Sequence, residues 1–302
     1  MGLKQIKNQI VSTKKTGKVT KAMESVSAVK MRKSQERAIA GKPYAESAIR
    51  ILHRISNSLD GKHFFETPSD TAEGHHCCIV ITSDKGLAGS LNSAVLKNLE
   101  KSFAGEKERM RMIAFGRKAV EFCSREGYML DKSYTNISDN VELDDMYDLI
   151  DFVTSMFDRG AYIKVSIAYQ NFVSTFEQNA LTRQVLPLEP NVLEVMVRDI
   201  LPKTGRYSEE EKDLGEHTYT IEPNPEEVLK SLIPKLVQIM VYRAMLESKA
   251  SEHSARMVAM KSATDKSKEI EKELTLRFNK ERQAVITAEV SEITGGIEAL
   301  KT

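Results

Sequence analysis

Residues 224–300, NPEEVLKSLIPKLVQIMVYRAMLESKASEHSARMVAMKSATDKSKEIEKELTLRFNKERQAVITAEVSEITGGIEAL, decide the fold of this chain. Asn224 and Pro225 predict a helix start, with asparagine as the N-cap, and Glu227 is placed to close a capping box onto the backbone of Asn224. No glycine interrupts the stretch until near its end, and its interior proline, Pro234, predicts a kink rather than a stop. At 1.5 Å per residue the helix would be roughly 100 Å long, so it must pair with another segment.

Apolar residues recur along this helix at steps of three and four, or their sums, which predicts a seam against a partner helix. They include Leu232, Leu236, Ile239, Leu246, Ala250, Met257, Met260, Leu274, Phe278, Val285 and Ala288. Polar residues stand at several positions that a tight zipper would fill with leucine, namely Arg243, His253, Thr264, Ser267, Glu271 and Glu281. The pattern predicts a long shaft with a partly polar seam.

The predicted partner is the other end of the chain, residues 3–58, which is rich in lysine, alanine and serine and has few helix breakers. One heptad phase begins apolar and turns small and polar, through Leu3, Ile6, Ile10, Thr13, Gly17 and Thr20, and a parallel track takes over through Val19, Met23, Val26 and Val29. Two terminal helices with a domain between them predict an antiparallel coiled coil, with both chain ends at one tip.

The middle of the chain alternates strand and helix patterns, which predicts an inserted, Rossmann-like α/β domain with a mainly parallel sheet. The expected strands are Cys77–Thr82, Arg111–Gly116 and Tyr162–Tyr169, the expected helices are Leu91–Leu99, Arg117–Arg125 and Leu143–Arg159, and Val173–Leu186 is expected to be extended and partly paired. The predicted domains are an N-terminal coiled-coil helix at 1–60, the α/β domain at 75–190, a connecting segment at 191–223 with a possible strand at Thr218–Ile221, and a C-terminal coiled-coil helix at 224–302.

The loop Ser83–Ser90 lies between a strand and a helix, as phosphate-binding loops do. It has neither GxGxxG nor GxxxxGK[ST], so the favoured interpretation is a tight turn that allows close helix packing. The pair His75-His76 before Cys77-Cys78 has no second pair at a ligand spacing, and the three cysteines are expected to be reduced and buried. No motif for catalysis, a metal or a cofactor is found, which favours a protein built for reach and contact.

Three blocks of the sequence resemble one family in the same order. Thr20–Lys33 is similar to the N-terminal helix, and Ser83–Asn92 to the central loop, of the gamma subunit of F-type ATP synthases. Ser251–Asp265, Asn279–Glu289 and Glu292–Gly296 resemble the C-terminal signature of that family. The resemblance implies a central rotor shaft inside a ring of alternating alpha and beta subunits. In that family the α/β domain and the lower coil form a foot on the membrane-embedded c-ring, beside the epsilon subunit.

The resemblance also implies a role for individual residues. Arg256, Gln283 and Thr287 match positions of the family that touch the catalytic ring, and Met23, with Lys21 beside it, matches the position that faces the lever of the beta subunit. Without the resemblance, each would be an ordinary helix residue. The chain is then expected to be a non-catalytic subunit without a cofactor, on the cytoplasmic face of a bacterial plasma (inner) membrane. The sequence shows no transit peptide and no apolar run of about 20 residues.

Two other interpretations remain open. Residues 2–58 carry thirteen basic and three acidic side chains, a local net charge of thirteen minus three, or +10, in a chain whose overall charge is +1. This charge would suit a coiled-coil protein that binds nucleic acid or acts as a scaffold, although Tyr44 is the segment's one aromatic side chain. An α/β enzyme with a helical oligomerisation shaft is the other alternative. Neither explains the C-terminal block.

Overall fold

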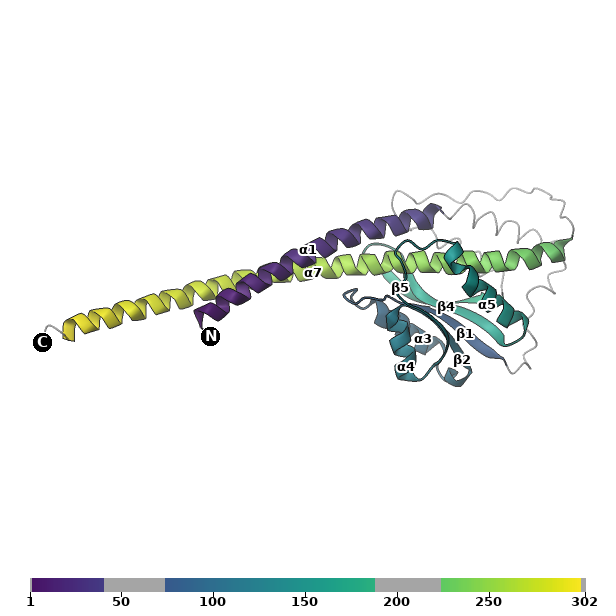
Figure 1. The fold of residues 1–302 in the computed structure, drawn as a ribbon, viewed down its shortest axis with the longest axis horizontal. Helices are drawn as coiled ribbons and strands as arrows, with labels where there is room; N and C mark the ends of the chain where they lie inside the picture. The colour runs from purple at the N-terminus through teal and green to yellow at the C-terminus, as the bar shows by residue number, and fades with distance from the viewer. Residues whose placement is uncertain (1, 41–73, 188–223, 300–302) are drawn as a thin grey trace. The chain divides into compact units, whose positions relative to one another are not determined.

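A computed structural model of the chain describes residues 2–40, 74–187 and 224–299 (Figure 1). The chain divides into two compact units, one made of Met1–Ser27 with Arg256–Thr302 and the other of Ala28–Ala255. The helices α1 (Leu3–Ala40, 38 residues) and α7 (Pro225–Ala299, 75 residues) each contribute to both units. The predicted end of the first helix near Ser58 and the possible strand at Thr218–Ile221 lie outside the described residues.

The second unit is built on one five-stranded sheet with the strand order β3-β2-β1-β4-β5 (Figure 1). Its strands are β1 (His75–Ile81), β2 (Met110–Phe115), β3 (Met129–Tyr134), β4 (Tyr162–Phe172) and β5 (Gln178–Leu186). All neighbours pair in parallel except β4 and β5, which are antiparallel. The predicted α/β class with a mainly parallel sheet is confirmed, and the predicted extended segment supplies the antiparallel edge strand.

Helices cover both faces of the sheet. Helices α3 (Leu91–Ser102) and α4 (Arg117–Glu126) pack on one face, where Cys78 and Val80 of β1 point. Helix α5 (Tyr147–Asp158) and the first part of α7 pack on the other face, where Cys77, Ile79 and Ile81 point. The alternation along β1 is the period of two that a strand buried on both faces requires.

The beginning of α7 therefore has a different role from the one its periodicity predicted. Leu236, Ile239 and Met245 belong to the same buried cluster as the sheet and α5, so they fill the core of the α/β unit. Periodicity alone predicted a coiled-coil seam for this part of the helix. The two arrangements give almost the same spacing of apolar residues, because a helix on a sheet and a helix on a helix each bury one stripe.

Three local predictions differ in detail from the structure. The edge strand β3 was not predicted, because its residues are mostly exposed or half-buried and lack an apolar pattern. The predicted helix Leu143–Arg159 divides into a short 3-10 turn at Asp144–Met146 and α5. Asn224 does cap α7, since its Oδ1 accepts from the N–H of Glu227 at 2.9 Å. The Glu227 carboxylate, however, accepts from the Asn224 side-chain amide at 3.0 Å instead of from the backbone.

Gly116 joins β2 to α4 at a place where no side chain fits. Its φ is +88°, and a Cβ there would lie 2.2 Å from the carbonyl oxygen of Thr82. Its N–H also donates to the carbonyl of Tyr134 at 2.8 Å, which continues the pairing of β2 with β3. Glycine is thus required by both conformation and space.

We expect Gly116→Ala to lower the free energy of unfolding by about 2–4 kcal/mol, from backbone strain and the clash with Thr82. Gly127→Ala is the matched control, because Gly127 also has a positive φ, of +72°, but open space around its Cβ position. That change should cost roughly 1 kcal/mol. Chemical denaturation of both variants measures the difference, and equal losses would contradict the steric argument.

Candidate functional site

The two long helices meet in an antiparallel seam within the first unit. The hydroxyls of Thr20 and Thr264 are 2.7 Å apart, and Lys14 Nζ lies 3.6 Å from Glu271 Oε1. A Cβ on Gly17 would lie 3.3 Å from the Cβ of Ser267, so the helices approach closely there. Small and polar residues at the seam permit this approach, as the sequence predicted.

The register extends from Leu3 to Ser27 along α1 and from Glu281 back to Met257 along α7. The occluded positions of α1 include Leu3, Ile6, Ile10, Thr13, Gly17, Thr20, Glu24 and Ser27. Those of α7 include Met257, Met260, Thr264, Ser267, Glu271, Leu274, Phe278 and Glu281. Each step forward along α1 matches the same step backward along α7, which places Leu3 opposite Glu281 and Ser27 opposite Met257. The alternating steps of three and four are those of a coiled coil.

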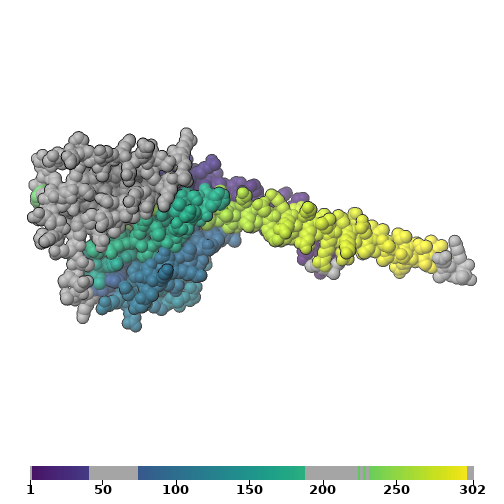
Figure 2. Space-filling view, turned by 180° about the vertical axis from the view of Figure 1, so that it is seen from behind, coloured from purple at the N-terminus to yellow at the C-terminus, as the bar shows by residue number. Residues whose placement is uncertain are grey.

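Two apolar stripes are left uncovered on these helices. On α1, Val19, Val26 and Val29 are 55–58% exposed, so the valine track does not take over the seam as predicted. On α7, the stripe Ile286, Val290, Ile293 and Ile297 is 50–63% exposed. The predicted seam positions Val285 and Ala288 are exposed too, and they lie beyond Glu281, the residue that the register places opposite Leu3. In Figure 2 the yellow end of α7 is a single helix with no other segment beside it on the visible face.

The predicted contact residues fall into two groups by exposure. Gln283 and Thr287 are exposed, and they are neighbours on one face because Thr287 Oγ1 donates to the carbonyl of Gln283 at 2.9 Å. Lys21 is exposed and pairs with Glu24 at 2.9 Å. Met23 is half-buried, whereas Arg256 is only 8% exposed and makes contacts within the chain. The structure thus brings Gln283 and Thr287 together and separates them from Arg256, which lies roughly 40 Å away along the helix at 1.5 Å per residue.

The loop after β1, which carries the central motif, forms a polar junction. Asp84 Oδ1 accepts from the N–H of Arg117 at 3.0 Å, and its Oδ2 accepts from the N–H of Ile137 at 3.1 Å. Thr82 Oγ1 accepts from the N–H of Ala119 at 2.8 Å. A carboxylate of the chain thus occupies the N terminus of α4, where a bound anion would be stabilised. Asp84 therefore packs the loop after β1 against the start of α4.

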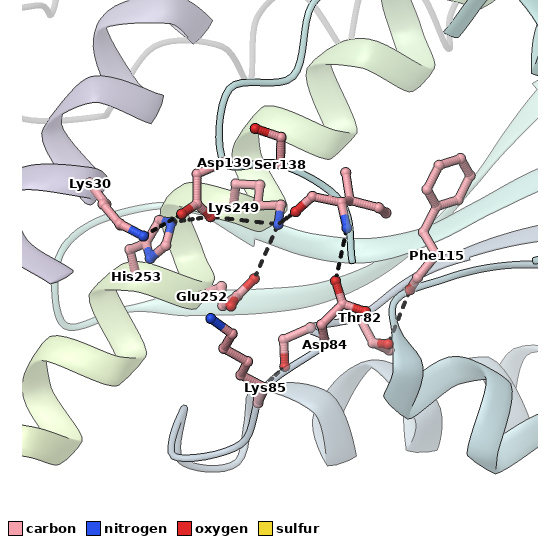
Figure 3. A network of polar contacts seen from close by, with 12 residues as sticks. Lys30, Thr82, Asp84, Lys85, Phe115, Ser138, Asp139, Lys249, Glu252 and His253 are labelled. Carbon is pink, nitrogen blue, oxygen red and sulfur yellow. Dashed lines mark hydrogen bonds and ion pairs between the residues drawn. The ribbon is translucent and has the colours of Figure 1, made fainter. Parts of the chain in front are cut away.

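Asp139 contacts side chains of both long helices within the second unit. Its carboxylate lies 2.5 Å from Lys30 Nζ, 3.1 Å from His253 Nε2 and 3.7 Å from Lys249 Nζ (Figure 3). Arg37 of α1 also donates to the backbone carbonyl of Asp139 at 3.3 Å. Sequence reasoning missed this residue, because it lies in a loop without a motif. The loop begins at Asn136, whose positive φ of +57° asparagine tolerates better than most residues.

The cysteines are free and buried, as predicted. Burial raises the pKa of the Cys123 thiol to about 11, which keeps it protonated at neutral pH. Across residues 2–40, 74–187 and 224–299, no three histidine, cysteine or acidic side chains come together as metal ligands. In the same ranges, no helix has a stretch long and apolar enough to cross a bilayer.

The seam register predicts a specific cross-link. We expect Thr20→Cys with Thr264→Cys to form a disulfide on mild oxidation, because the two side chains already meet and disulfides need closely spaced Cβ atoms. Val19→Cys with Thr264→Cys is the control, since Val19 faces solvent. Non-reducing electrophoresis reads the result, and equal cross-linking of the two pairs would show that the register is wrong.

The Asp139 contacts predict a pH dependence of stability. The hydrogen bond from His253, with Lys30 and Lys249 nearby, lowers the pKa of the Asp139 carboxyl below its ordinary value, although burial opposes the shift. A lowered pKa in the folded state adds stability above the unfolded value of about 3.9 and loses it as the pH falls further. We expect Asp139→Asn to be less stable than the parent at pH 7 and the gap to narrow below about pH 4. Urea denaturation across this range measures the gap, and a constant gap would contradict the assignment.

Comparisons with known proteins agree with this architecture along the whole chain. A family model described as ATP synthase matches residues 2–300. The ATP synthase gamma chain of Heliobacterium modesticaldum is 34% identical over 302 residues, covering 99% of both chains. The ATP synthase gamma chain of a Roseiflexus species is 36% identical over 304 residues, covering 98% of both.

Solved structures show the same fold. A chain in a cryo-EM structure of the mitochondrial ATP synthase of Euglena gracilis matches with a TM-score of 0.66 at 17% identity, covering 99% of this chain and 94% of that one. A chain from the central stalk and c-ring of the Tetrahymena thermophila mitochondrial enzyme matches with a TM-score of 0.58 at 24% identity, covering 81% and 99%. With the family model matched over nearly every residue, the chain belongs to the ATP synthase gamma chain family.

Proposed function

We propose that this chain is the central rotor shaft of an F-type ATP synthase, which couples the ion-driven rotation of a membrane c-ring to the synthesis or hydrolysis of ATP in a ring of alpha and beta subunits. The observation that carries the proposal is the antiparallel helix pair of this chain, which is 34% identical to an ATP synthase gamma chain along 99% of its length. A rotor must present unlike faces to its surroundings, so that each catalytic subunit is pushed in turn. The described helices have such unlike faces.

The uncovered surfaces of the helix pair suit a surrounding ring. Within residues 3–27 of α1 the exposed lysines are Lys4, Lys7, Lys14, Lys15, Lys18 and Lys21. These cations would face the acidic lever segments that the family's catalytic subunits carry, and an attraction between exposed charges of this kind is screened by salt. The bare apolar stripe of α7, from Ile286 to Ile297, would contact the ring where α1 no longer covers the helix. An exposed apolar stripe of this length marks an interaction surface.

The solvent exposure of each side chain indicates which of the proposed residues can contact the ring directly. Gln283, Thr287 and Lys21 are accessible to a partner, so they are the leading contact residues, with Met23 beside Lys21. Arg256 is buried within the chain, and its side chain would act on the ring by holding the helix in place. In this proposal the chain has no active site and no cofactor of its own. Its α/β unit would contact the epsilon subunit and the c-ring, as a peripheral protein at the cytoplasmic face of a bacterial inner membrane.

Reconstitution tests this function directly. The chain is mixed with separately purified alpha and beta subunits from the same source, and the product is examined for a stoichiometric complex that hydrolyses MgATP. The chain alone should not hydrolyse MgATP. If no complex forms under conditions that assemble a known homologue, the rotor proposal fails, and salt-dependent binding of nucleic acid becomes the next measurement.

On that complex, we expect Gln283→Ala to reduce MgATP hydrolysis several-fold while leaving the stability of the isolated chain within about 0.5 kcal/mol, because the residue is exposed. Arg256→Ala should lower the stability of the isolated chain as well, because the residue is buried. Arg277→Ala is the control on the same helix, because Arg277 is exposed and projects about 120° away from Gln283. Full activity of the Gln283 variant, or an equal loss in the Arg277 variant, would remove Gln283 from the ring contacts.

A further inference from the structure

One stretch of α7 is both polar and buried. Ser248, Lys249, Ser251, Glu252, His253 and Ser254 are each at most 7% exposed. Buried polar groups destabilise a fold unless hydrogen bonds compensate for lost contact with water. The stretch follows the apolar part of α7 that packs on the sheet, so the α/β unit holds this one helix by two different kinds of contact.

The hydrogen bonds of this stretch run to two separate segments of the unit. Ser251 Oγ donates to the carbonyl of Gln170 in β4 at 3.2 Å, and Ser254 Oγ donates to the carbonyl of Thr175, in the turn between β4 and β5, at 2.6 Å. Lys249 Nζ donates to the carbonyl of Ile137 at 3.2 Å. Lys249 and His253 also face the carboxylate of Asp139.

These two segments hold α7 from opposite sides. At about 100° per residue, Lys249 and His253 project about 40° apart, and Ser251 and Ser254 about 60° apart, with roughly 150° between the centres of the two pairs. Hydrogen bonds weaken steeply when their angles change, so bonds on two opposite sides resist rotation of the helix about its own axis. Apolar packing, which has no preferred direction, resists such rotation less.

The same loop also holds α1. Lys30 bonds the Asp139 carboxylate, and Arg37 donates to its backbone carbonyl, so one residue contacts both long helices. The loop is in turn fixed to the sheet, since the N–H of Ile137 donates to Asp84 at the end of β1. Figure 3 shows this path from Asp84 through the loop to Lys30 and His253.

We propose that Asp139 is a positioning residue that locks residues 28–40 of α1 and 249–254 of α7 to the α/β unit, so that torque passes between the helices and the sheet without slippage. The Ser251 and Ser254 hydroxyls complete this lock on the opposite side of α7. The inference rests on the proposed rotor function. Under it, ATP hydrolysis turns the helices, whereas ion transport requires the α/β unit to turn with them.

The test uses the holoenzyme in membrane vesicles and compares two readouts: MgATP hydrolysis, and the ATP-driven membrane potential reported by an oxonol dye, which does not depend on which ion is moved. We expect Asp139→Ala to keep most of the hydrolysis and to lower the ratio of potential to hydrolysis several-fold. Asp139→Glu, which keeps the carboxylate, should recover part of the ratio. Glu121→Ala removes an exposed pair with Lys118 in the same unit and should leave the ratio unchanged.

A second variant guards against failure of Asp139→Ala to fold. Ser251→Ala with Ser254→Ala removes the bonds on the other side of α7 and should lower the same ratio without any change of charge. If the ratio of potential to hydrolysis is unchanged in both variants, the proposed role of Asp139 and of the two serines in torque transfer is wrong. A parent chain that neither assembles with alpha and beta subunits nor supports a potential would instead overturn the rotor function itself.

Discussion

The need to cover a 75-residue helix shapes the rest of the chain. In proteins most of the stability of a helix comes from packing of its apolar face, and most of α7 is covered by one segment or another. Leu236 to Met245 lie under the sheet, Ser248 to Ser254 are held by polar groups, and Met257 to Glu281 follow the register of α1. Only the part beyond Glu281 has no partner in the described chain, and its apolar stripe is exposed.

The sequence predicted the close approach of the two helices around Gly17 and Thr20, because small side chains are needed wherever two helix backbones come close. Gly17 and Ser267 are small where the helices approach, and Thr20 meets Thr264, so the heptad phase and its polar interruptions could be read directly. Periodicity could not show that Leu236 packs on a sheet, since either partner requires the same stripe. The strand β3 was missed for a related reason. A sheet edge needs little apolar surface, and its residues therefore carry little signal.

The sequence could identify only some of the residues that matter for contacts. The resemblance identified Gln283 and Arg256 equally, and only the fold separates an exposed residue from one that is 8% exposed. Asp139 could not be found at all, because its importance comes from Lys30 and His253, which are more than 100 residues away on either side. Contacts of this range depend on tertiary structure, and a loop without a motif gives no local indication of them.

The distribution of polar and apolar contacts along α7 has a mechanical consequence. Apolar packing around Leu236 holds the helix against the sheet but has no preferred direction, so it tolerates small rotations of the helix about its axis. Hydrogen bonds at Ser251 and His253 contribute modestly to the net stability, yet each fixes an angle. A shaft that transmits torque needs such fixed angles at the place where its helices join the rest of the rotor. Small, polar residues along the Gly17 and Thr264 seam instead keep the pair narrow, which suits a part that must turn inside another protein.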